Sequence, residues 1–182
     1  NFGGASLSGL DFTDIGLVNQ VHGSTFIRAN LSDSNFEGVD LSHQGVYHKV
    51  FKDKAHLINS SHIQVVRDIW SDGGQQRILS LEVRGNDLAV DYILFNNFKN
   101  TNLENANFKN ADLRYAVFYL ADLTNADLSG ADLSNTYLGY ADLSNANLSG
   151  ANLEGAVLDN AILTNANLSG ANLNCVGHEI CI

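Results

Sequence analysis

The stretch ADLTNADLSGADLSNTYLGYADLSNANLSG, residues 121–150, repeats a unit of five residues. The third residue of each unit is Leu, and the first is Ala except at Thr136. Across residues 101–173 every fifth residue is Leu or Phe without exception. A period of five matches neither the 3.6 residues of a helical turn nor the alternation of a strand. A short fixed period predicts a solenoid, in which each unit buries its apolar side only against its neighbours.

The composition narrows the class of protein. The chain has 182 residues, 45% of them hydrophobic, so one substantial core can form. No tract of apolar residues is long enough to span a membrane. The formal net charge of −10 disfavours direct binding to nucleic acid, because neutralising phosphates requires Lys and Arg. Proline is absent, as expected of a ladder that uses nearly every backbone donor.

The repeat divides the chain into four segments. Amino-terminal repeat coils are expected over 1–51, although their pattern is rougher than the later one. An inserted excursion is expected over 52–85, where the motif fails. Regular coils are expected over 86–174, and a carboxy-terminal cap over 175–182.

Local patterns add detail to these segments. The nine-residue gap between Leu17 and Phe26 predicts a distorted corner with one residue deleted. Within the excursion, apolar residues at spacings of three and four predict a short helix over 61–70. The alternation in QRILSLEV predicts a strand over 76–83. The competing interpretation treats this stretch as degenerate five-residue units, since Ile78 and Val83 share the later phase.

These units resemble the A(D/N)LXX motif of the pentapeptide repeat family, and the resemblance covers most of the chain. The Leu-rich regularity is similar to that of the cyanobacterial members. The resemblance implies an all-β fold, a right-handed quadrilateral β-helix of about seven coils, interrupted here by the excursion. It also implies that the central Leu or Phe and the small residue two places before it point inward.

A narrow, dry interior agrees with this arrangement, since Leu at one inward position and Ala at the next leave no room for larger side chains. A charged residue placed there would lack a partner and would destabilise the fold. The predicted core residues are Leu103, Phe108, Leu113, Phe118, Leu123, Leu128, Leu133, Leu138, Leu143, Leu148, Leu153, Leu158, Leu163, Leu168 and Leu173.

One outward surface differs from the other three. Residues twenty apart should lie in one column, and three of the four outward columns carry mostly Asp or Asn. The fourth carries apolar and aromatic residues, which suggests a contact with a partner or a second copy. Drift toward residues that pack well on a β surface is the alternative. The candidate contact residues are Val117, Tyr119, Leu120, Tyr137, Tyr140 and Val157.

The excursion is a second candidate contact, because projecting insertions often confer specificity. It holds Trp70, the only Trp, and basic residues that include Arg67 and Arg77. Four His lie in or just before it, but their spacings match no known set of metal ligands. We therefore expect no metal and no cofactor.

Cys175 and Cys181 follow the last full unit. A disulfide that closes the carboxy-terminal end is the favoured interpretation, and two unpaired thiols the alternative. The Cys pair and the lack of any Met favour an extracytoplasmic location over the cytoplasm. The resemblance to the Leu-rich cyanobacterial members implies the periplasm or the thylakoid lumen.

The sequence offers little for catalysis, because its carboxylates are expected on flat outer surfaces and not in a cleft. We therefore expect a non-enzymatic scaffold that binds either an unidentified protein partner or a second copy of itself. The alternative that the resemblance to the family implies is a DNA-mimicking protein that binds and protects topoisomerase (gyrase). The negative charge and the excursion favour that alternative, whereas the regular Leu-rich units and the short carboxy-terminal segment oppose it.

Overall fold

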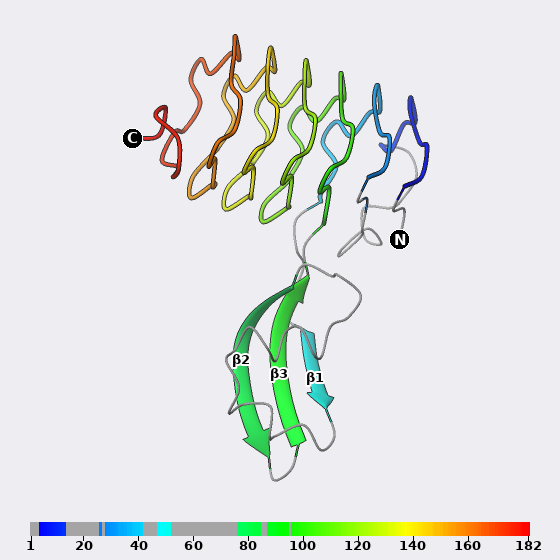
Figure 1. Ribbon diagram of the computed structural model, residues 1–182, viewed down its shortest axis with the longest axis vertical. Coiled ribbons are helices and arrows are strands. Elements are labelled where there is room, and N and C mark those ends of the chain that lie inside the picture. The colour runs from blue at the N-terminus through cyan, green and yellow to red at the C-terminus, as the bar shows by residue number, and fades with distance from the viewer. Residues whose placement is uncertain are drawn as a thin grey trace.

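The computed structural model describes residues 4–13, 26, 28–41, 47–51, 76–84, 87–94 and 96–182. These residues form a stack of coils, from which a three-stranded sheet extends to one side (Figure 1). The coils are those of a right-handed quadrilateral β-helix. Within the described ranges, no helix has the length and hydropathy needed to cross a membrane.

Each five-residue unit makes one side of a coil and ends in a turn. The residue before the central Leu bridges to the coil above, as Asn102 does with Asp122. Two backbone hydrogen bonds hold this bridge, from Leu103 N–H to Asp122 O at 2.7 Å and from Asp122 N–H to Thr101 O at 3.0 Å. Ala106 N–H then donates to Leu103 O at 3.0 Å and closes the turn. The backbone therefore changes direction every five residues, which makes four corners per coil.

The interior is filled by the central residue of each unit and the small residue before it. Every predicted core residue from Leu103 to Leu158 is at most 1% exposed. Leu163, Leu168 and Leu173 are partly buried, because they lie in the last coil of the stack.

From residue 101 onward, the small inward position of each unit holds Ala except at two places, where it holds Thr. The hydroxyl of Thr101 donates to Phe26 O at 2.8 Å, and that of Thr136 donates to Leu133 O at 2.7 Å. Both buried hydroxyls are therefore satisfied, which removes the cost of placing a polar group in the core.

One interior column changes from Phe to Leu along the stack. The rings of Phe26 and Phe98 stack with centroids 4.9 Å apart, and those of Phe98 and Phe118 at 4.8 Å. Leu138 and Leu158 continue the same column. The ring separation equals the usual spacing of paired strands, so successive coils bring the aromatic rings into contact without distortion.

The two longest columns of bridged residues have six layers each. The first two layers are 24 residues apart, since Ser6 pairs with Asn30 and Asp11 with Asn35. This coil is therefore longer than the regular twenty residues. The distorted corner expected between Leu17 and Phe26 lies outside the described residues. One column consists of Ser6, Asn30, Asn102, Asp122, Asp142 and Ile162, and the other of Asp11, Asn35, Asn107, Asp127, Asn147 and Asn167.

The sheet is antiparallel, with β3 (Asp87–Leu94) between β1 (Tyr47–Phe51) and β2 (Gln76–Arg84). The register between β2 and β3 shifts between Ile78 and Ser80, as at a β-bulge. The strand expected from the QRILSLEV alternation is confirmed and corresponds to β2.

The excursion is longer than the expected 52–85. The described coil residues on either side of the sheet end at Leu41 and begin again at Asn96. The side-chain amide of Asn96 donates to Leu41 O at 2.5 Å and links these two residues. Thus β1 and β3 lie in ranges, 1–51 and 86–174, that were assigned to coils from the sequence.

The physical reason for this difference lies in the small-residue position. An apolar residue at every fifth place, such as Leu88 and Ile93, also fits a strand. The residues two places earlier are Asn86 and Asp91, and neither is the Ala that most of the regular units have at this position. The central residue alone therefore does not distinguish a coil from a strand.

Candidate protein-contact face

The structure places the six predicted contact residues on one side of the coil stack. Val117 bridges to Tyr137, and Tyr137 bridges to Val157. The two residues that follow Phe118 and the two that follow Leu138 form the adjoining turns. We call the surface formed by Val117, Tyr119, Leu120, Tyr137, Tyr140 and Val157, together with Lys99 and Gly139, the tyrosine face.

The ring of Tyr119 contacts the rings of two other tyrosines on this face. The rings of Tyr119 and Tyr137 stack with centroids 5.6 Å apart and planes 6° from parallel. The ring of Tyr140 meets Tyr119 edge to face, with centroids also 5.6 Å apart. The Nζ atom of Lys99 lies 5.3 Å from the centroid of the Tyr119 ring, within the range of a cation–π contact.

Gly139 makes this ring arrangement possible. A Cβ atom built at Gly139 would lie 3.2 Å from the Tyr137 ring and 3.4 Å from the Tyr119 ring. The first separation is tighter than ordinary van der Waals contact, so a larger residue would push the rings outward. Gly139 and Lys99 were not among the predicted contact residues, although their spacing of twenty from Tyr119 was a signal that could have found them.

The face is exposed and partly hollowed. Leu120 is 45% exposed, Tyr140 49% and Tyr137 37%. Val117 is buried, and it lines a depression of about 350 Å³ together with Lys99, Tyr119 and Tyr137. Val117 therefore contributes the wall of a pocket and little outer surface.

Two residues of the face have an unusual backbone. From Asn100 to Gly170 every fifth residue has a positive φ, the conformation that type II turns require of their third residue. All of these residues are Asn or Gly except Tyr115 (φ 65°), Leu120 (φ 58°) and Tyr140 (φ 58°). Bulky side chains are disfavoured in this region, so the tyrosine face keeps strain that Asn would relieve.

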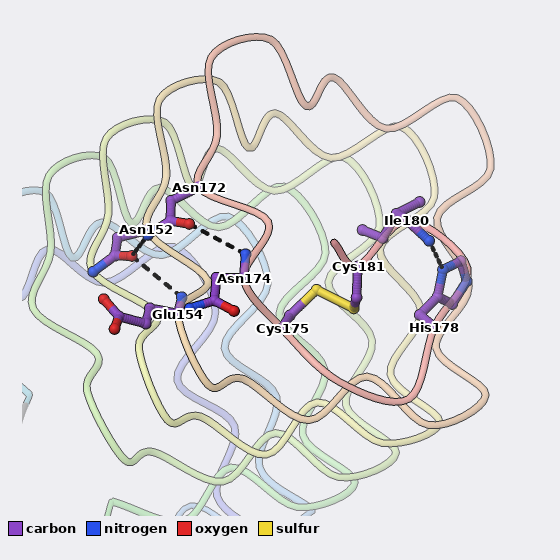
Figure 2. Close-up of a disulfide and its surroundings, with 8 residues drawn as sticks. All are labelled: Asn152, Glu154, Asn172, Asn174, Cys175, His178, Ile180 and Cys181. Carbon is purple, nitrogen blue, oxygen red and sulfur yellow. Dashed lines mark hydrogen bonds between the residues drawn. A yellow bond between two sulfur atoms is a disulfide. The ribbon is translucent and has the colours of Figure 1, made fainter.

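The acidic and amide rows on the other sides have a structural role. In each unit the side-chain oxygen of the bridged residue accepts the N–H group two residues later, as Asp122 does from Thr124 at 3.0 Å. Figure 2 shows the same bond from Asn174 N–H to Asn172 at 3.1 Å, and the Asn172 amide donating in turn to Asn152 at 2.9 Å. These Asp and Asn side chains therefore stabilise the turns and link neighbouring coils.

Arg114 lies on one of these acidic rows. Its guanidinium donates to both carboxylate oxygens of Asp112, with Nη2 at 2.6 Å from Oδ2 and Nε at 2.8 Å from Oδ1. Hydrogen bonding to Asp112 raises the pKa of Arg114 above its ordinary value. Among the described residues, no group of three or more His, Cys, Asp or Glu side chains is arranged to hold a metal ion.

A disulfide joins Cys175 and Cys181 at the carboxy-terminal end of the stack (Figure 2). Their Cα atoms are 4.9 Å apart. Between them the chain turns, and Ile180 N–H donates to Nδ1 of His178 at 3.3 Å. Ile180 and Cys181 pack against the core, so this segment covers part of the open end of the last coil.

The insertion candidates are described only in part. Arg67 and Trp70 lie outside the described residues, as does the helix expected over 61–70. Arg77 lies on β2, where it pairs with Ile93 of β3. Whether the excursion binds a partner therefore stays a prediction.

Comparison with known proteins identifies the family. A family model for pentapeptide repeats matches eight copies over residues 21–43, 101–139 and 141–174, a little more than half of the chain. The matched ranges leave out all three strands of the sheet. No curated protein sequence matches the chain significantly.

Several solved structures of pentapeptide repeat proteins are similar to this chain. One from the Arabidopsis thaliana thylakoid lumen is 45% identical over 42% of this chain and 54% of its own, with a TM-score of 0.42. One from Nostoc PCC 7120 is 45% identical over 41% of this chain and 62% of its own, with a TM-score of 0.41. One from the cyanobacterium Cyanothece 51142 is 21% identical over 96% of this chain and 89% of its own, with a TM-score of 0.42. On the matched repeats, this chain belongs to the pentapeptide repeat family.

Proposed function

We propose that this chain is a non-enzymatic interaction scaffold whose tyrosine face binds a protein partner. Pentapeptide repeat proteins are generally structural or interaction scaffolds. The observation that carries the proposal is the pair Leu120 and Tyr140. Both side chains are strongly exposed, and both stand in a left-handed backbone that favours Asn or Gly.

The strain at these two positions supports a role outside the coil itself. A left-handed backbone costs a bulky residue roughly 1–2 kcal/mol. Burial of the Leu120 side chain offsets little of this free-energy cost, because the residue is 45% exposed. Residues held in such conformations tend to cluster at ligand-binding sites, where the side chain serves a contact that the fold alone does not need.

The chemistry of the face favours a protein as the partner. Its exposed surface combines Tyr rings with Leu120, a composition typical of the energetic centre of protein interfaces. The depression beside Lys99 and Tyr119 is apolar along Val117 and offers one positive charge at its edge. Nucleic acid is disfavoured because the chain carries a net charge of −10.

The test replaces Leu120 and Tyr140 together with Asp. Asp tolerates a left-handed backbone, so the coil should fold normally while the face becomes negatively charged. The matched control replaces Asn125 and Asn145 with Asp, because these have the same φ on the neighbouring side of the same coils. Affinity capture from native extract should lose its bound protein with the first variant and keep it with the second. Equal retention by both variants would show that the face is not the contact surface.

A supercoiling assay with purified gyrase separates this scaffold from a topoisomerase-binding DNA mimic. We expect no change in supercoiling at micromolar protein. The Asp side chains support this expectation, because Asp122 and its equivalents accept hydrogen bonds within their own turns. Inhibition or protection of gyrase would favour the alternative function.

We also propose that the protein is located in an oxidising compartment. The disulfide between Cys175 and Cys181 supports it, because such bonds persist mainly in extracytoplasmic spaces. Alkylation of the protein in intact cells before lysis should leave both thiols unlabelled. Quantitative labelling of both would place the protein in a reducing compartment.

A further inference from the structure

The tyrosine face changes in character along the stack. The first turn residues of successive coils are Lys99, Tyr119, Gly139 and Asp159. Backbone hydrogen bonds place these residues in neighbouring layers: Asn100 N–H donates to Tyr119 O at 3.0 Å, and Leu120 N–H donates to Gly139 O at 3.1 Å. The column therefore begins with a positive charge, has a large and then a minimal side chain at its centre, and ends with a negative charge.

The neighbouring column has a related order. It consists of Asn100, Leu120, Tyr140 and Asn160, so its two ends are amides and its centre is apolar. The contact between layers continues here, because Tyr140 N–H donates to the carbonyl of Asp159 at 2.8 Å. Both columns thus run through the same four layers.

A twofold axis makes this surface complementary to itself. If a second copy faces the first with its stack reversed, each column opposes the same column in the opposite direction. Lys99 then faces Asp159 of the second copy, and Tyr119 faces its Gly139. In the neighbouring column Leu120 faces Tyr140, and the polar ends face each other. Every position in the first column meets a residue of opposite charge or opposite size.

The local charge explains why like molecules would associate despite a net charge of −10. Arg28 adjoins Lys99, since Arg28 N–H donates to the carbonyl of Lys99 at 3.1 Å. Neither side chain forms an ion pair with any residue in the described part of the chain. Both charges lie at one end of the face and the Asp159 carboxylate lies at the other.

We infer that the partner of the tyrosine face is a second copy of this chain, bound side by side with its coil stack antiparallel. This inference rests on the proposed function of the face and names its partner. Four coils at about 4.8 Å each make the contact only roughly 19 Å long. An interface of this size is in the small class, so the dimer is expected to be weak and to depend on concentration.

The experiment is sedimentation equilibrium of the full chain over a range of concentrations. It compares the wild-type chain with variants in which the charge of Lys99 or Asp159 is reversed. The wild-type chain should change reversibly from monomer to dimer as concentration rises. Lys99→Glu and Asp159→Lys should each raise the dimer dissociation constant at least tenfold, because each places like charges together twice per dimer. The double variant should return to within a few-fold of wild type.

Lys109→Glu is the matched control, because Lys109 is also the first residue of a turn but lies on another side of the coil. It should leave the dissociation constant unchanged. A melting curve for each variant checks that the coils are intact. Failure of the double variant to recover association would overturn the antiparallel pairing.

The outcome also distinguishes the inference from the proposed function. A chain that stays monomeric at millimolar concentration, yet loses another protein when Leu120 and Tyr140 become Asp, overturns the inference and leaves the proposed function intact. If that variant still self-associates and still retains its protein partner, both the inference and the proposed function are overturned.

Discussion

Leu120 and Asn125 occupy equivalent places in successive turns of one coil and have nearly the same φ, 58° and 59°. Asn suits this left-handed conformation and Leu does not. The two turns therefore have the same backbone with different intrinsic stability, and the less stable one lies on the tyrosine face.

Replacing Leu120 with Asn should stabilise the protein by about 1 kcal/mol, because the left-handed backbone is then occupied by a residue that accepts it. Urea unfolding monitored by circular dichroism measures this change. The same variant should associate less well, since Leu120 is 45% exposed and available to a partner. The reciprocal variant Asn125→Leu should destabilise by a similar amount with no gain in association. A loss of stability in Leu120→Asn would mean that the coil itself depends on Leu120.

The loss of stability on replacing a core Leu with Ala should depend on how deeply that Leu lies in the stack. Leu143 is fully buried, so Leu143→Ala should lower the free energy of unfolding by about 2–5 kcal/mol. Leu163 is only partly buried in the last coil, and Leu163→Ala should cost clearly less. Denaturant unfolding of the two variants provides the comparison. Equal losses would contradict an interior that opens only at the end of the stack.

The carboxy-terminal disulfide should protect the last coil. Replacing Cys175 and Cys181 with Ser removes a short cross-link, which is worth about 2 kcal/mol in the chain-entropy description. Hydrogen exchange should become faster at Val176, whose N–H donates to Ala156 O at 2.9 Å. Exchange at Leu123 in the middle of the stack should not change. Uniform acceleration along the stack would indicate that the coils unfold as one unit.

Asp11 provides a pH-dependent contact at the amino-terminal end. Hydrogen bonds from the hydroxyl and backbone N–H of Thr13, at 2.6 and 2.9 Å, hold the pKa of Asp11 below its ordinary value. A lowered pKa means that the contact stabilises the fold above the ordinary pKa of Asp and is lost as pH falls through the lowered one. Thr13→Val should move the pKa of Asp11 upward in an NMR titration. An unchanged pKa would assign the shift to the backbone N–H alone.

The five-residue period was enough to predict the coils and their interior. Leu123 and Leu133 each follow a small inward Ala, and both are buried in the interior. Because the same pattern recurs, each coil packs against a neighbouring coil with a similar interior surface. The period also predicted that Tyr119, Tyr137 and Tyr140 lie on one side of the stack, because residues twenty apart share a column.

Only the tertiary structure shows the contacts that do not recur with the five-residue period. The pairing of Phe51 with Leu88 in the sheet joins distant residues that no repeat relates, and their spacing also fitted a coil. The contact of the Tyr119 and Tyr137 rings across Gly139 depends on side-chain orientation and on the space left by a missing Cβ. Periodicity specifies contacts that recur in every coil, whereas contacts made once in the molecule depend on three-dimensional packing that a linear pattern does not contain.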